Sequence, residues 1–290
     1  MYICRTMPRL CVIIVTYNSA QWVDRCLGSL RGSTVKADVT VIDNASSDNT
    51  VQLIREGYPE ARIIESKTNL GFGAANNIGF REALQADYDF VYLLNADAWV
   101  EPDCLERLLD SFKPGFGVLS PVQKDAQGEL DRNFAKKTSK FLNQSEEDIV
   151  EVPFVMAAHW MVSREALRTV GGFSPAFTQY GEDDNWIHRL HFHGLKAGVV
   201  PSACAVHDRA ARTESKESRM RFKCISAVVK LSDPGRCLAW MMLREPLELI
   251  GMSLKNASTA PLKFLPAFLS RYPEIIAHRK NSKKKSAFLV

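Results

Sequence analysis

The chain has 290 residues, 46% hydrophobic and 24% charged, which are the proportions of an ordinary globular protein. Its net charge of +4 is uneven: residues 214–290 carry 15 Lys and Arg against 6 Asp and Glu, a net of +9, so the rest carries −5. A mildly acidic body argues against nucleic acid as its main ligand, and a basic tail is typical of a segment that meets an anionic surface.

Cysteine usage and the N-terminal pattern bear on the compartment. The seven cysteines are odd in number and scattered, without a Cys-x-x-Cys pair. They indicate neither a disulfide framework nor a structural zinc site, and they fit a reducing compartment. The first apolar run, residues 10–15, is too short for a secretion signal or a membrane span. We therefore expect a cytoplasmic protein.

Strand and helix patterns alternate along the first part of the chain. Short apolar, β-branched runs predict strands, and apolar residues at helical spacing predict helices. The expected strands are 10–17, 39–42, 61–64 and 90–94, and the expected helices are about 20–30, 48–55, 71–85 and 102–109. Four such alternations predict a parallel sheet with right-handed crossovers.

The pattern then becomes irregular. Residues 123–148 are polar with few apolar positions, and we expect a mobile loop or lid there. Order resumes at 152–156 and in helices at about 163–170 and 182–192, and residues 196–206 predict paired short strands around Pro201. We expect an α/β body over 1–211, with helices on both faces of a mostly parallel sheet, and a helical, basic amphipathic extension over 212–290.

The extension alternates apolar clusters with basic residues. No run reaches about 18 uncharged apolar residues, so it should not span a bilayer. Its helices could lie on a membrane, where Arg279, Lys280 and Lys283–Lys285 would contribute roughly 1 kcal/mol each near anionic lipid. Alternatively, the helices pack on the body and leave a solvated basic end.

Polar and small residues follow all four expected strands. They are Thr16, Tyr17 and Asn18; Asp43 and Asn44; Asn69, Gly71, Phe72 and Gly73; and Asn95, Ala96 and Asp97. Ligands of open α/β sheets bind beyond the carboxyl ends of strands. A nucleotide there needs a carboxylate and glycines that let the backbone approach phosphate, and a divalent cation on a diphosphate needs a hard ligand such as Asp97. Each residue alone could be a turn or cap residue, but the four groups together favour a nucleotide site.

A second cluster, Glu182, Asp183 and Asp184, begins the helix expected at 182–192. One or two acids there would interact favourably with the helix dipole, but three neighbours repel one another. Such crowding can raise a carboxylate pKa and produce a general base. We therefore favour a catalytic role for this cluster.

Histidines give a weaker signal. His207 follows the apolar residues 204–206 and would complete a metal site with Asp97 if the last strands lie beside strand 90–94. A lone histidine is more often structural. His188, His191 and His193 lack the His-Glu-x-x-His spacing, and we interpret them as surface or packing residues.

In this order the motifs resemble glycosyltransferase family 2 enzymes of GT-A fold, closest in style to the rhamnosyltransferase-like bacterial enzymes of surface-polysaccharide synthesis. The resemblance covers about residues 10–210. It rests on six segments: 15–18, 43–48, 69–77, 93–97, 171–173 and 180–183.

The resemblance implies a role for each matched residue. Asp43 resembles the carboxylate that reads the pyrimidine base, and the segments 16–18, 69–73 and 95–96, with Asn44, would line the donor nucleotide. Asp97 corresponds to the last aspartate of an Asp-x-Asp motif that holds Mn²⁺ or Mg²⁺ on the donor diphosphate. The first position of that motif is Asn95, a weaker ligand than aspartate.

The resemblance also implies roles for residues that would contact the metal and the acceptor. His207 matches a late metal-ligand position, although the sequence after it departs from the family pattern. Asp183 matches the base that deprotonates the acceptor hydroxyl, and Glu182 would orient the acceptor.

The implied activity is an inverting, metal-dependent transfer from a UDP- or dTDP-sugar, dTDP-rhamnose being one candidate. The acceptor would be a saccharide or lipid-linked saccharide at the inner face of the cell membrane. A catalytically silent nucleotide-sugar-binding scaffold is the alternative, and it would not need Glu182 or Asp183. A Rossmann oxidoreductase is disfavoured for two reasons. The glycine segment at 71–73 lacks the third glycine of the dinucleotide-binding motif, and it follows the third expected strand rather than the first.

Overall fold

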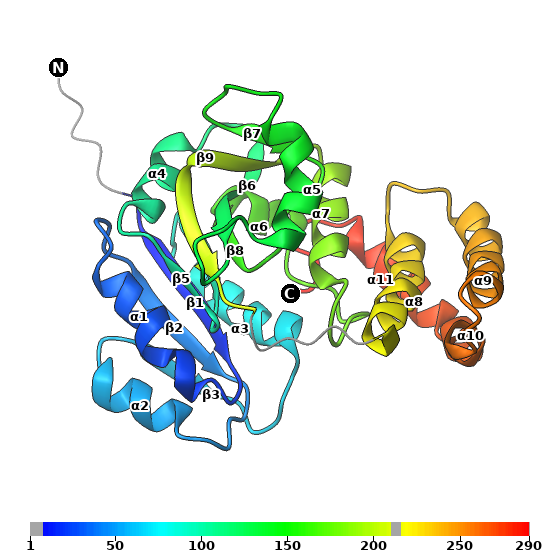
Figure 1. The fold of residues 1–290 in the computed structure, drawn as a ribbon, viewed down its shortest axis with the longest axis horizontal. Helices are drawn as coiled ribbons and strands as arrows, with labels where there is room; N and C mark the ends of the chain where they lie inside the picture. The colour runs from blue at the N-terminus through cyan, green and yellow to red at the C-terminus, as the bar shows by residue number, and fades with distance from the viewer. Residues whose placement is uncertain (1–7, 210–215, 290) are drawn as a thin grey trace.

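The computed structural model describes residues 8–209 and 216–289 as an α/β body with a group of C-terminal helices on one side (Figure 1). The domain boundary expected at 211/212 lies outside the described residues. No helix within these ranges combines the length and apolar content needed to cross a bilayer.

One nine-stranded sheet forms the centre of the body, in the order β3-β2-β1-β4-β8-β6-β9-β5, with β7 paired to β9. Its strands are β1 (Leu10–Thr16), β2 (Asp38–Asp43), β3 (Arg62–Glu65), β4 (Phe90–Asn95), β5 (Ala98–Val100), β6 (Phe116–Lys124), β7 (Val150–Val152), β8 (His159–Ser163) and β9 (Lys196–His207). The first four are parallel, as their alternation with helices predicts, so their carboxyl ends share one edge. Beyond β4 the sheet is mixed, because β8 runs antiparallel to both β4 and β6.

Helices cover both faces of the sheet. The body contains η1 (Ala20–Trp22), α1 (Val23–Arg31), α2 (Thr50–Gly57), α3 (Phe72–Gln85), α4 (Cys104–Ser111), α5 (Arg132–Leu142), α6 (Arg164–Val170) and α7 (Glu182–Phe192). Alternate residues of β1 divide the core: Val12 and Ile14 pack with α1, α2 and α4, whereas Cys11 and Ile13 pack with α3, α6 and α7. This period-two burial is what a strand covered on both faces requires.

The expectation of a loop over 123–148 was wrong for the middle of this segment, because residues 132–142 form the helix α5, and its role as a lid stays a prediction. Asp131 caps α5 by accepting a hydrogen bond from the backbone N–H of Phe134 at 2.7 Å. Phe134 and Thr138, one turn apart, are fully buried, and the remaining positions of the helix are largely polar. The helix thus has a narrow buried stripe, which explains why its sequence looks like a polar connection.

The paired strands expected at 196–206 are also corrected, because these residues form the single strand β9. The register against β6 shifts where Val200 and Cys204 oppose Pro121 and Val122, so the residues around Pro201 are accommodated by an irregularity within the strand. Proline in a strand is tolerated at such bulges.

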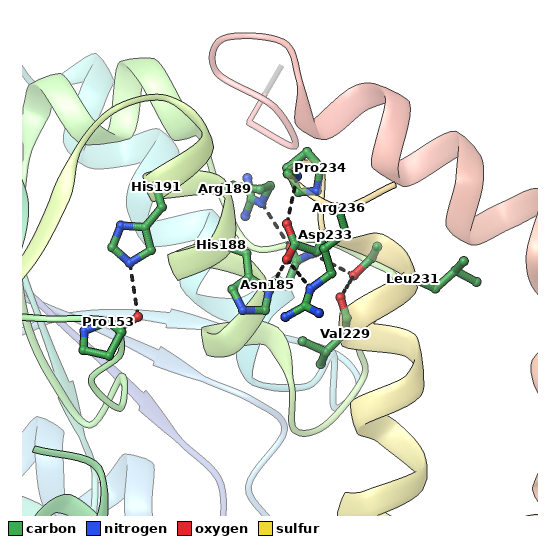
Figure 2. Close-up of polar contacts among 12 residues, drawn as sticks. Pro153, Asn185, His188, Arg189, His191, Val229, Leu231, Asp233, Pro234 and Arg236 are labelled. Carbon is green, nitrogen blue, oxygen red and sulfur yellow. Dashed lines mark hydrogen bonds and ion pairs between the residues drawn. The ribbon is translucent and has the colours of Figure 1, made fainter. Parts of the chain in front are cut away.

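The C-terminal helices are α8 (Lys216–Ser232), α9 (Leu238–Lys255), α10 (Ala260–Ser270) and α11 (Tyr272–Ser282), and they share an apolar core with Phe177 of the body. Figure 2 shows the junction between α7 and α8. His188 lies 3.5 Å from the carboxylate of Asp233, and Asn185 donates a hydrogen bond to Ser232. His191 faces the carbonyl oxygen of Pro153 at 3.1 Å. His188 and His191 therefore have packing roles.

The end of the chain returns to the body. The backbone N–H of Gly172 donates a hydrogen bond to the carbonyl of Ala287, and Leu289 joins the core beneath α7. Arg279, expected at a membrane surface, is instead buried and donates hydrogen bonds to carbonyl oxygens of residues 231–236. Lys283 lies over the Phe192 ring at 6.0 Å, so the basic end is attached to the body.

Candidate active site

Asp43 ties together the ends of β1 and β2. Its Oδ1 accepts hydrogen bonds from the hydroxyls of Thr16 at 2.8 Å and Ser46 at 2.6 Å, and its Oδ2 accepts one from the Ser46 backbone N–H. Thr16 and Asp43 are both buried. Since a carboxylate has about four acceptor positions, Asp43 keeps capacity for one further donor. Its visible role is to fix the strand ends.

Tyr17 and Asn18 follow β1 in different settings. Tyr17 is exposed, and Asn18 has a φ of 50°. The Asn18 side chain accepts a hydrogen bond from the backbone N–H of Ser47 at 2.8 Å. Asparagine tolerates this left-handed conformation better than most residues, so Asn18 serves the turn whether or not a nucleotide contacts it.

Asn44 and Asn69 join the loops after β2 and β3. Asn44 donates a side-chain hydrogen bond to Asn69 at 2.8 Å and accepts one from the backbone N–H of Leu70. Asn69 in turn accepts a hydrogen bond from the backbone N–H of Gly71. This network shapes the segment that enters α3.

The glycines of that segment are required by packing. A Cβ on Gly71, where φ is +81°, would collide with the carbonyl oxygen of Thr178. A Cβ on Gly73 would lie 2.9 Å from Cβ of Phe173 and 3.8 Å from Cβ of Glu182. Phe72 packs edge-on against Phe173, with ring centroids 5.7 Å apart. The expected nucleotide segment thus lies directly against the segment 173–182.

Asp97 and His207 are brought together by strand pairing. Asn95 ends β4, Ala96 and Asp97 form a turn, and β5 then pairs antiparallel with β9, Ala98 opposite His207. His207 Nε2 lies 3.2 Å from Asp97 Oδ1, although β9 is not next to β4. The expected proximity is therefore observed, through a different pair of strands.

The two side chains offer a carboxylate oxygen and an imidazole nitrogen. This donor set fits Mn²⁺ or Mg²⁺, and it would leave most coordination positions to a diphosphate and water. In the part of the chain that is described, no group of three or more His, Cys, Asp or Glu side chains could hold a metal.

Arg209 is a neighbour that the sequence did not single out. Its Nε donates a hydrogen bond to Nδ1 of His207 at 3.2 Å and lies 3.6 Å from the carboxylate of Asp131. In this arrangement Nδ1 of His207 is the acceptor, so the hydrogen of the neutral ring is on Nε2. Metal ligation through Nε2 would require Arg209 to release Nδ1, so Arg209 links the metal position to the start of α5.

The acid cluster occupies the first turn of α7, immediately after Gly181 in the left-handed region at φ 88°. Glu182 is buried, and its Oε2 has no hydrogen-bond partner among the described residues. Asp183 and Asp184 are half-buried, and Asp183 accepts a hydrogen bond from the backbone N–H of Asp184 at 2.8 Å. A buried carboxylate oxygen without a donor costs free energy, which a ligand hydroxyl would relieve.

Burial is the largest cause of the raised pKa of all three acids. Repulsion from Asp183 raises the pKa of Glu182 and Asp184 further. Lys137 of α5 partly opposes the shift at Asp183 and Asp184. Such shifts are common at catalytic sites, where a carboxylate must accept a proton near neutral pH.

Sequence reasoning assigned no role to the residues that support this cluster. Asn77 of α3 accepts a hydrogen bond from the backbone N–H of Phe173 and donates one to its carbonyl. On the other side, Tyr180 packs against Phe222 of α8, with ring centroids 4.3 Å apart. Asn77 lies in the matched segment 69–77, which is the signal that could have identified it, whereas no local signal marks Phe222.

Comparisons with known proteins agree with this geometry. Residues 11–171, more than half of the chain, match the family model described as Glycosyl transferase family 2. The chain is 28% identical over 237 residues to an N-acetylglucosaminyl-diphospho-decaprenol L-rhamnosyltransferase of Mycobacterium tuberculosis, covering 70% of this chain and 76% of that protein. It is 24% identical to the Glycosyltransferase AglE of Haloferax volcanii, covering 94% and 85%.

Solved structures show the same fold. A mannosyltransferase from Pyrobaculum calidifontis, in complex with GDP-Man and Mn²⁺, superposes with a TM-score of 0.59 at 20% identity, over 96% of this chain and 85% of that one. TarS of S. aureus, residues 1–349 in complex with UDP-GlcNAc, gives 0.60 at 18% identity, over 93% and 81%. The likeness establishes the GT-A fold.

Proposed function

Because the chain belongs to glycosyltransferase family 2, we propose that it transfers a sugar from a UDP- or dTDP-sugar to a hydroxyl group in cell-surface polysaccharide synthesis. The acceptor is a saccharide or a lipid-linked saccharide. One observation carries the proposal: the segment Gly71–Gly73 packs against Phe173 and Glu182, so the donor side and the acid cluster adjoin. dTDP-rhamnose is the first donor to test, because the M. tuberculosis relative is an L-rhamnosyltransferase.

Asp183 is the proposed base. Its carboxylate takes the proton of the acceptor hydroxyl while that oxygen forms a bond to the anomeric carbon of the donor. The bond from this carbon to the diphosphate oxygen breaks, and the diphosphate leaves with the electron pair. A single displacement inverts the configuration at the anomeric carbon. Burial raises the pKa of Asp183, which strengthens it as a base once it is ionised.

Glu182 is proposed to position the acceptor. Burial and the charge of Asp183 raise its pKa, so at neutral pH it tends to hold a proton. A protonated Glu182 can donate one hydrogen bond and accept another. The lack of a partner for Oε2 among the described residues supports this role.

On the donor side, Asp43 with Thr16 would face the base and ribose, and the loops around Asn44 and Asn69 would border the nucleotide. Asp97 and His207 would hold Mn²⁺ or Mg²⁺. When bound, such a cation neutralises charge on the departing diphosphate. Arg209 would release Nδ1 of His207 on metal ligation and remain nearby as a fixed positive charge.

A lipid-linked acceptor would place the protein at the inner face of the cell membrane. The M. tuberculosis relative supports this, because its name gives N-acetylglucosaminyl-diphospho-decaprenol, a lipid-linked sugar, as its substrate. Family membership leaves no support for the oxidoreductase. A measurement of turnover distinguishes the enzyme from the catalytically silent scaffold.

The test has two steps. Thermal unfolding is measured with a panel of nucleotide sugars and Mn²⁺, since a ligand that binds only the native state raises its stability. The donor that stabilises the protein is then incubated with it, and release of the nucleoside diphosphate is followed with saccharide and polyprenyl-linked acceptors. Binding without any turnover would contradict the proposal in favour of the scaffold.

A further inference from the structure

The outward face of α9 is apolar along its whole length. Five large side chains recur at alternating steps of three and four residues and therefore share one face of the helix. They are Trp240, Leu243, Leu247, Ile250 and Leu254, with exposed fractions of 58%, 66%, 68%, 39% and 79%. We call this set the α9 stripe. Exposed leucines of α10, Leu262 and Leu269, add to the apolar surface of this region.

The opposite face already anchors α9 to the protein. Met241 and Leu249 are buried in the core of the C-terminal helices, and the buried Glu245 is paired with Lys230 of α8 at 3.2 Å. The stripe is therefore not needed for packing within the chain. Apolar surface costs about 25 cal/mol per Å² when it stays in water, and a continuous exposed patch marks an interaction surface.

The position of α9 and α10 in the molecule favours a broad, flat partner. α9 and α10 form the end of the molecule that lies away from the central sheet (Figure 1). A helix at an extremity can meet a surface over its full length without obstruction by the body. Tryptophan at one end of the stripe is typical of a helix that rests at a membrane interface.

The charges around the stripe select an anionic partner. The helices α9 and α10 expose Arg244, Lys255 and Lys263, and Glu248 is their one exposed acid among the described residues. Glu248 is already paired with Lys230 at 3.0 Å. A second copy of the chain would bring these cations against their own equivalents, whereas an anionic lipid surface complements them.

We propose that the α9 stripe, together with the exposed leucines of α10, docks on an anionic lipid bilayer with α9 parallel to its plane. The biological reason for such docking rests on the proposed function, because a lipid-linked acceptor would be in that bilayer. The docking helices adjoin the acid cluster through α8: a Cβ on Gly181 would lie 2.9 Å from both Ile225 and Val229. Docking would therefore hold the acceptor side of the site near the membrane.

Vesicle co-sedimentation of the full chain, without donor or acceptor, tests the proposal. Wild type should bind vesicles containing phosphatidylglycerol more tightly than vesicles of phosphatidylcholine alone. The double variant Leu243→Glu, Leu247→Glu should bind on the order of tenfold or more weakly. Leu53→Glu, at an exposed leucine of α2, is the matched control and should bind like wild type.

A second measurement covers the case in which the double variant fails to fold. The tryptophan emission of wild type should shift to shorter wavelength on vesicle addition, and the shift should be lost in Trp240→Phe. An unchanged shift in that variant would overturn the proposal. So would a wild-type dimer, seen by sedimentation velocity, that the double variant converts to monomer while vesicle binding stays the same.

The results of these vesicle experiments can be distinguished from the results that test the proposed function. Loss of vesicle binding with unchanged donor-sugar hydrolysis would support docking and leave the enzyme intact. Turnover by a wild-type protein that ignores vesicles would overturn docking alone.

Discussion

The imidazole of His207 lies 3.2 Å from the carboxylate of Asp97, although the two residues belong to distant parts of the chain. Antiparallel pairing of β5 with β9 produces this proximity, with Ala98 opposite His207. The pair stands beyond the carboxyl ends of the parallel strands, where ligands of open α/β sheets bind. Only one of its members is acidic, so metal affinity should depend strongly on the donor diphosphate.

Asp97→Ala should weaken donor binding in the presence of Mn²⁺, by roughly tenfold to a hundredfold, the range measured when metal sites lose supporting contacts. Titration calorimetry with and without a chelator measures the effect. Asp103→Asn, in an exposed pair with Arg107, is the control and should bind the donor normally. Equal affinity of the wild type with and without chelator would refute the metal assignment.

His207→Ala should raise the Mn²⁺ concentration needed for half-maximal turnover and leave turnover at saturating Mn²⁺ closer to that of wild type. The reason is that Asp97 and the diphosphate remain as ligands. A metal titration of initial rates measures this. An unchanged metal dependence would show that His207 is a structural neighbour of Asp97, held by Arg209.

Glu182 should make stability depend on pH. Burial and the charge of Asp183 raise its pKa from 4.5 to about 8. The folded protein therefore binds a proton that the unfolded chain releases, and this stabilisation is fully present below 4.5 and lost as pH rises through about 8. Glu182→Gln should show a smaller loss of Tm across that window. The exposed control Glu129→Gln should follow wild type, and identical pH curves for all three proteins would contradict the assignment.

Phe134 tests whether residues 123–148 are a packed element. Its ring is fully buried at the start of α5, so Phe134→Ala should lower the free energy of unfolding by about 3–5 kcal/mol. Chemical denaturation provides the measurement, with the exposed Lys140→Ala as the control. A loss near zero would restore the expectation of a mobile loop.

Parts of this structure can be read from the sequence because their signals are local. Strands β1 to β4 are apolar runs, and the residues after them share an edge through parallel topology alone. Strand β6 was missed because Ser120, Pro121 and Gln123 interrupt it. Ser120 and Gln123 are fully buried and hydrogen-bonded to each other at 3.1 Å, so a core strand carries polar residues.

The residues of the candidate site divide in the same way, into those with a local sequence signal and those that depend on tertiary packing. Asp97, Glu182 and Asp183 stand in recognisable motifs, whereas His207 is a lone histidine whose place beside Asp97 depends on the pairing of β5 with β9. Arg209 and Lys137 stand in no such motif, since their relation to the site depends on where α5 packs. The packing of Gly71 and Gly73 against the segment 173–182 is likewise a tertiary contact that spacing along the chain cannot show.

The proposed activity depends most directly on Asp183 as the base. Transfer should be measured for wild type and Asp183→Asn with the same donor, alongside donor affinity and thermal unfolding. We expect Asp183→Asn to lower turnover by about 10²–10⁴-fold, the usual contribution of a general base, with donor affinity and folding retained. Near-normal turnover by a folded Asp183→Asn protein would contradict this assignment.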